Sequence, residues 1–80
     1  MRLYLICGVY TDGAHKGRGF ILGKGGYVLD TNRKPLKEDC YSTERAAKMV
    51  ATKLNKRNEF ESKHCNYITP CKYHVSEINY

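Results

Sequence analysis

The residues with the widest chemical range in this 80-residue chain are histidines and cysteines near its C-terminal end. His64, Cys65, Cys71 and His74 carry the side chains that zinc prefers in proteins. Their spacing is not that of a C-x2-C knuckle, and Pro70 stiffens the turn between the two pairs. On a strand, Cys71 and His74 would also point to opposite faces. The pattern therefore favours ordinary thiols and surface imidazoles, and we predict neither a metal site nor a cofactor.

Acid–base catalysis is a second chemistry that the histidines allow. His15, His64 and His74, with Lys16 or Tyr73, could supply the acid and the base for phosphodiester cleavage. Nothing in the sequence orients these side chains toward one another. A small histidine-dependent nuclease is thus kept as a third hypothesis, and no catalytic residue is predicted.

A glycine-rich stretch, Gly23-Lys24-Gly25-Gly26, could approach a phosphate through its backbone N–H groups. It lacks the earlier glycine and the following Ser or Thr of a Walker loop, and it does not open a helix. Glycines in a short connection are typical of a hairpin turn, which needs positive φ angles. We interpret this stretch as a turn.

Positive charge is distributed over the whole chain. The net charge is +6, and residues 1–41 and 42–80 each hold seven Lys or Arg against four Asp or Glu, which gives +3 and +3. Such a surface attracts polyanions or an acidic protein face. The N-terminal apolar run ends at Thr11, too early for a secretory signal or a membrane span, so we expect a soluble, cytoplasmic protein with four reduced cysteines and no membrane partner.

The strongest local pattern is a helix over Ser42–Arg57. One stripe of about 140° is apolar at helical periodicity, and it consists of Ala46, Ala47, Val50, Ala51 and Leu54. Ser42 or Thr43 can cap the first turn, where Glu44 also suits the helix dipole. Met49 is an apolar residue on the opposite, basic side, where it could contact a partner.

The basic side of this helix and the basic loops are the predicted binding residues. They are Arg45, Lys48, Met49, Lys53 and Lys56 on the helix, with Lys16, Arg18 and Lys24 in the loops. The partner is a protein or a nucleic acid, and the residues leave this choice and the oligomeric state open. A solvated face that compensates the helix dipole is the alternative interpretation. We expect no small-molecule substrate.

The remaining pattern predicts a single α+β domain over residues 1–80. Strands are expected at Arg2–Tyr10, Gly19–Leu22, Tyr27–Asp30 and Tyr67–Ile78. Pro70 interrupts the last of these, which indicates either an edge strand or a strand that starts near Cys71. The predicted order is βββαβ, with three or four mostly antiparallel strands and the helix across one face. Residues 58–63 are polar and could continue the helix, and Cys40 and Tyr41 could form a further pairing or only lead into it.

Two resemblances extend this interpretation. Gly13-Ala14-His15 and the alanine face of the helix resemble the second half of a double-stranded-RNA-binding domain, although that family's first helix is absent. Thr43–Asn55 and Tyr73–Ile78 resemble small accessory proteins of tailed bacteriophages. The second resemblance implies a non-enzymatic host-takeover or anti-defence protein that inhibits or redirects a nuclease, toxin, CRISPR complex or polymerase by binding it. Direct action on RNA or DNA is the alternative.

Overall fold

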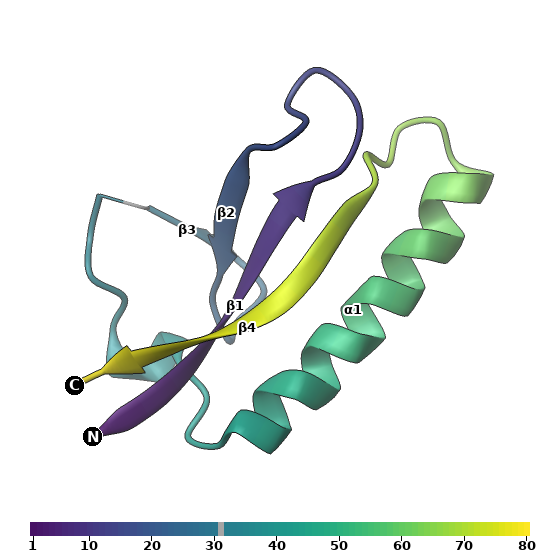
Figure 1. Ribbon diagram of the computed structural model, residues 1–80. Coiled ribbons are helices and arrows are strands. Elements are labelled where there is room, and N and C mark those ends of the chain that lie inside the picture. The colour runs from purple at the N-terminus through teal and green to yellow at the C-terminus, as the bar shows by residue number, and fades with distance from the viewer. Residues whose placement is uncertain (31) are drawn as a thin grey trace.

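The computed structural model describes residues 1–30 and 32–80. Its elements are β1 (Arg2–Tyr10), β2 (Gly19–Leu22), β3 (Val28–Leu29), a 3-10 turn η1 (Lys37–Asp39), α1 (Glu44–His64) and β4 (Cys71–Asn79). The strands form one antiparallel sheet in the order β3-β2-β1-β4, and α1 runs beside β4 (Figure 1). The predicted α+β fold with the order βββαβ is therefore confirmed.

Strand β1 is the centre of the sheet because it is apolar on both faces. Ile6 is paired with Leu22 of β2 on one side and with Val75 of β4 on the other, and only 1% of its surface is exposed. Side chains alternate between the two faces of a strand, so β1 supplies a core to each face of the sheet. One core lies under α1, and the other lies under the connection that leads into α1.

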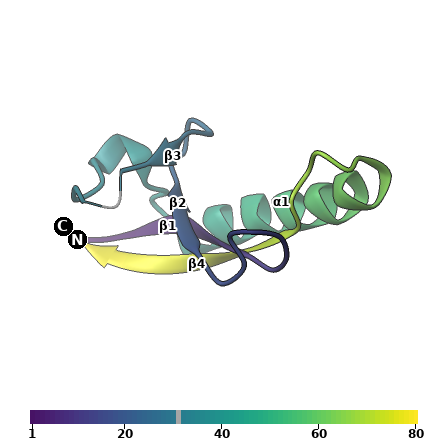
Figure 2. The same ribbon diagram turned by 90° about the horizontal axis from the view of Figure 1, so that it is seen from above.

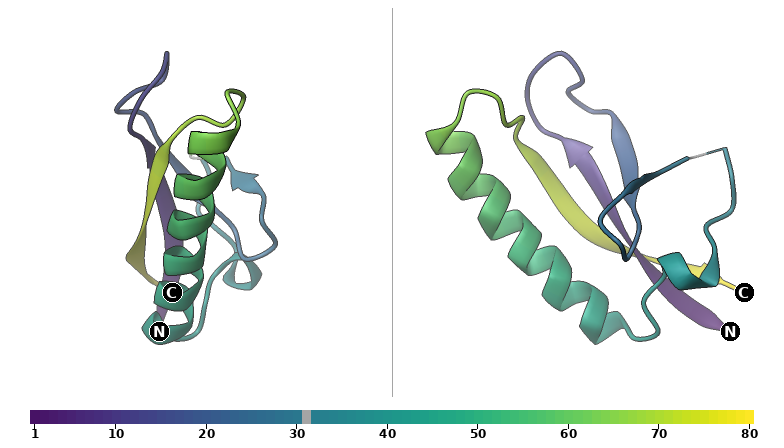
Figure 3. Two further views of the ribbon diagram at one scale, coloured as in Figure 1. Left: turned by 90° about the vertical axis from the view of Figure 1, so that its right-hand side faces the viewer. Right: turned by 180° about the vertical axis from the view of Figure 1, so that it is seen from behind.

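Helix α1 packs closely because small residues face the sheet. Ala47 is fully buried and Ala51 is 5% exposed, and Ala47 packs with Ile6 and Tyr41. Views along and across the sheet show α1 on one face only, along β4 and β1 (Figures 2 and 3). Alanine brings the helix backbone near the strands, which places polar side chains of α1 within reach of the sheet.

The ends of α1 differ in how well the sequence predicts them. The Thr43 side chain accepts a hydrogen bond from the Ala46 backbone N–H at 3.2 Å, as the capping pattern predicts. The helix then continues to His64, through residues 58–63, which are polar except for Phe60. Ion pairs four residues apart, Arg57 with Glu61 and Lys63 with Glu59, support this extension.

The second face of the sheet is covered by the chain between β3 and α1. Leu3, Leu5 and Cys40 form its buried core, with Ile78 and Tyr80 packed against them. This connection joins the sheet through a bridge between Tyr4 and Tyr41, whose backbone groups exchange two hydrogen bonds of 2.9 and 2.7 Å. The pairing that the sequence left open at Cys40 and Tyr41 is thus formed by Tyr41.

The glycine-rich stretch is a hairpin turn between β2 and β3, as predicted. The Gly23 N–H donates to the Tyr27 carbonyl at 2.8 Å, and Gly26 has a φ of 89°, which favours glycine. Strand β3 comprises Val28 and Leu29 alone, shorter than the predicted Tyr27–Asp30.

Candidate functional site

The solvent-facing side of α1 carries a row of residues that we call the outer stripe. Its members are separated by three or four positions, a spacing that places them on one side of a helix, and they are Arg45, Met49, Lys53, Lys56 and Phe60. All five are exposed. A shallow groove of about 610 Å³ runs along the first part of this row, lined by residues that include Arg45, Met49 and Lys56.

Two apolar side chains on the outer stripe are in solvent. Met49 is 55% exposed and Phe60 is 65% exposed. The sequence predicts Met49 on this side, but it does not single out Phe60, because residues 58–63 read as a polar extension of the helix. Phe60 lies eleven positions after Met49, close to three helical turns, and this spacing is the signal that could have found it.

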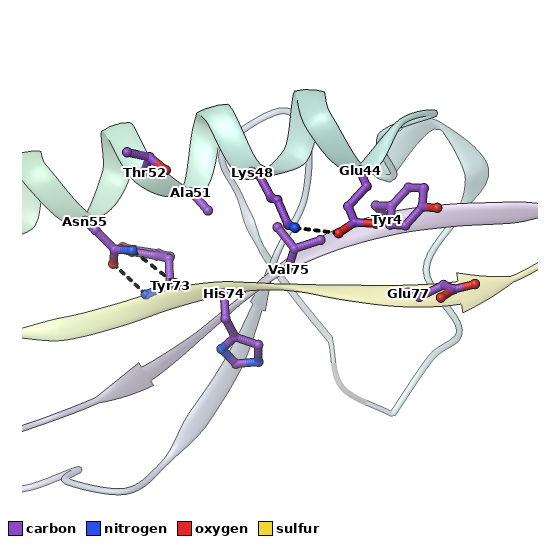
Figure 4. A pocket seen from close by; sticks show the side chains of 10 residues that line it. All are labelled: Tyr4, Glu44, Lys48, Ala51, Thr52, Asn55, Tyr73, His74, Val75 and Glu77. Carbon is purple, nitrogen blue, oxygen red and sulfur yellow. Dashed lines mark hydrogen bonds and ion pairs between the residues drawn. The ribbon is translucent and has the colours of Figure 1, made fainter.

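Ion pairing divides the cations of α1 into two groups. Lys48 lies 2.6 Å from a carboxylate oxygen of Glu44, and this hydrogen bond and charge raise the pKa of the Lys48 amine (Figure 4). Arg57 and Lys63 are paired with glutamates in the same way. In contrast, no carboxylate of residues 1–30 and 32–80 lies within ion-pair distance of Arg45, Lys53 or Lys56.

The predicted cations of the loops lie at two separate places in the fold. Lys16 and Arg18 are in the loop before β2, and Lys24 is in the turn after β2, so they are at the two ends of that strand. The loop with Lys16 lies beside the connection between α1 and β4, where the Thr11 N–H donates to the Pro70 carbonyl at 3.0 Å. The Lys24 amine is 5.9 Å from the ring centre of Tyr41, before the start of α1. The helix, not the loops, is where predicted binding residues gather.

The three histidines lie in three different elements. His15 is in the loop after β1, with its ring centre 6.0 Å from that of Tyr10. His64 ends α1 and packs on Phe60 at 4.3 Å between ring centres. His74 points away from α1, on the other face of β4 (Figure 4). In the part of the chain that the structure describes, no group of three His, Cys, Asp or Glu residues is placed to hold a metal ion.

An aromatic cluster covers the part of the sheet beside α1. The Phe20 ring meets Tyr73 edge to face at 5.8 Å and lies 5.1 Å from Tyr10, between ring centres. Burial raises the pKa of the Tyr73 phenol, and the neighbouring Cys71 adds to this effect. Tyr73 therefore stays protonated at neutral pH and contributes packing to the cluster.

Comparisons with protein-family models, curated proteins and solved structures found no match to this chain. None of the helices within residues 1–30 and 32–80 has the length and apolar character needed to span a lipid bilayer.

Proposed function

We propose that this protein is a non-enzymatic binding protein whose outer stripe docks on an acidic surface of another protein. The observation that carries the proposal is the selective pairing of charges on α1. Cations beside the stripe are paired with glutamates, whereas Arg45, Lys53 and Lys56 on the stripe lack a carboxylate partner among the described residues. Their charges are available to an external anion.

The apolar members of the stripe favour a protein surface over a phosphate backbone. Met49 and Phe60 expose more than half of their surface, and a row of phosphates would offer them no apolar contact. Protein interfaces are enriched in methionine and aromatic residues at their centre, with charged residues toward the rim. An acidic surface with shallow apolar pockets, one for each of these two side chains, would match the stripe.

The resemblance of Thr43–Asn55 and Tyr73–Ile78 to phage accessory proteins supports a target in a bacterial host. On this proposal the protein inhibits or redirects a defence nuclease, a toxin, a CRISPR complex or a polymerase by occupying its surface. Such inhibition requires no catalytic residue in this chain. Direct binding of RNA or DNA by the basic surface is the alternative, and the experiment below separates the two.

The test is a pull-down from bacterial lysate with the tagged protein, with and without nuclease treatment. The proposal predicts one host protein that stays bound after nuclease treatment and is lost with Lys53→Glu/Lys56→Glu. The matched control is Arg33→Glu/Lys34→Glu, which changes net charge equally but lies between β3 and η1, at exposed positions outside the predicted binding residues. Bound material that disappears with RNase or DNase would support the nucleic-acid alternative. If both variants lose the host protein equally, the outer stripe is not the interface.

A second measurement uses the apolar side chains. With the purified target, Met49→Ser/Phe60→Ser should weaken binding about as strongly as removing two cations, because buried apolar anchors often dominate an interface. With a nucleic-acid duplex, whose bases are stacked inside the helix, the same variant should change affinity little, and each removed cation should instead reduce the salt slope of binding by about one unit.

A further inference from the structure

Strand β4 lies at an edge of the sheet, and half of its free edge is already occupied by α1. Backbone groups of alternate residues in an antiparallel edge strand point outward, away from the sheet. At Tyr73, the outward N–H donates to Oδ1 of Asn55 at 2.7 Å, and the outward carbonyl accepts from Nδ2 of Asn55 at 3.0 Å (Figure 4). One side-chain amide of the helix thus replaces the backbone of a neighbouring strand.

A second asparagine, about one turn further along α1, bonds the backbone of two residues, one at the start of β4 and one just before it. Oδ1 of Asn58 accepts from the Cys71 N–H at 2.9 Å, and its Nδ2 donates to the Thr69 carbonyl at 3.3 Å. Asn55 and Asn58 therefore close the edge from Thr69 to Tyr73. No further strand can pair there without displacing α1.

The other half of the edge is open. Val75 and Glu77 follow Tyr73 at intervals of two, so their N–H and carbonyl groups also point outward. Within residues 1–30 and 32–80, neither the side chains nor the backbone supplies a hydrogen bond to these outward groups. A cleft of about 430 Å³ lies beside them, between β4 and the first half of α1 (Figure 4).

We propose that this open edge of β4 binds an extended segment of a protein partner as an added strand. The segment would form about four hydrogen bonds, a donor and an acceptor with each of Val75 and Glu77. It must lack proline where it faces β4, and it must end before Tyr73, whose groups are bonded to Asn55. The site therefore takes a short strand.

The chemistry of the cleft also restricts the side chains of the segment. A residue opposite Val75 points toward α1, where Ala51 and Thr52 are short and leave room beneath the helix. The charged side chains that line the cleft are already paired, Lys48 with Glu44 and Glu77 with Arg2, so an uncharged residue at this position fits best. The net charge of +6 attracts a partner protein that is acidic outside this segment. This site goes beyond the proposed function, since the outer stripe and the β4 edge can bind independently.

The experiment selects binders from a displayed library of random linear peptides and follows amide hydrogen exchange by NMR. Peptides bound at the edge should protect the amides of Val75 and Glu77. Glu77→Pro removes one outward N–H, at a kind of edge position where proline is tolerated, and should weaken binding by about tenfold or more. The matched control Glu77→Gln removes the charge but keeps the N–H and should bind as the original protein does.

Three results would overturn the proposal: no enriched peptide, enriched peptides that leave both amides exchanging as in the free protein, or equal binding to Glu77→Pro and Glu77→Gln. Protection in the unaltered chain decides the matter even if the proline variant fails to fold. Binding that is lost in Lys53→Glu/Lys56→Glu but not in Glu77→Pro would place the peptide on the outer stripe. That outcome would refute the edge site while supporting the proposed function.

Discussion

Replacing Asn55 by alanine tests whether α1 stabilises the edge of β4. The change removes two hydrogen bonds to Tyr73, of 2.7 and 3.0 Å. A typical intramolecular hydrogen bond contributes about 0.5–1.5 kcal/mol net, so the loss is about 1–3 kcal/mol. Alanine has the higher helix propensity, which returns roughly 0.5 kcal/mol. We expect the free energy of unfolding to fall by about 0.5–2.5 kcal/mol.

Urea denaturation followed by far-UV circular dichroism measures this change. For a domain of this size, 1 kcal/mol corresponds to a shift in Tm of roughly 4–8 °C, so thermal unfolding gives an independent reading. The matched control is Thr52→Ala on the same helix, at an exposed position. It gains helix propensity without losing a hydrogen bond in the structure, and should be slightly more stable than the original chain.

Amide exchange at Tyr73 shows whether the loss arises at the edge. In Asn55→Ala the Tyr73 N–H should exchange faster, while amides of β4 that point toward β1 keep their protection. The reasoning is refuted if Asn55→Ala is as stable as Thr52→Ala and the exchange rate at Tyr73 is unchanged. The asparagine would then be a surface residue with no effect on the strand.

Three further predictions concern the core, the helix cap and pH. Gly8→Ala should lower the free energy of unfolding by about 1–3 kcal/mol, because the new Cβ would overlap the ring of Phe20. Adding Phe20→Leu should recover part of this loss in urea denaturation. Thr43→Ala should cost about 1 kcal/mol by losing the bond from the Ala46 N–H, whereas Thr43→Ser should cost less. Burial raises the pKa of Tyr73, so the contribution of this phenol to the free energy of unfolding is complete below about pH 10 and is lost as the pH rises further. Tyr73→Phe should therefore lose less stability than the original chain between neutral and alkaline pH, as measured by urea denaturation at each pH. An equal dependence of the unfolding free energy on pH in the two proteins would contradict the reasoning.

Local patterns explain why the fold could be predicted to this extent. The alternation in β1 and the alanine stripe of α1 are set by neighbouring residues, and the structure confirms a central strand and a helix packed on one face. The C-terminal part of α1 was less certain from sequence because residues 58–63 carry no apolar stripe. The ion pairs on this segment and the bonds of Asn58 to β4 support it in the fold.

The surfaces are harder to predict than the fold, because they depend on what α1 leaves uncovered. Charge identifies Arg45, Lys53 and Lys56 as candidates, and the structure separates them from Lys48, which is paired with Glu44. The spacing of four between Glu44 and Lys48 is a sequence signal for this pair. Pro70 is a sequence signal that β4 lies at a sheet edge, but nothing in the sequence indicates which part of that edge is open. The open part depends on strand order and on Asn55, whose bonds to Tyr73 join residues 18 positions apart.

The small residues under α1 connect the packing of the helix to the open edge. An asparagine side chain is short, so Asn55 can reach the backbone of β4 only because Ala47 and Ala51 let the helix approach the sheet closely. An exposed strand edge is a risk for aggregation, and proteins usually cover or interrupt it. Here the two asparagines cover the edge from Thr69 to Tyr73, while the edge at Val75 and Glu77 stays open beside a cleft. Because half of the β4 edge is closed and half is open, any added strand must be a short segment. This restriction favours selective binding of one segment over unlimited growth of the sheet.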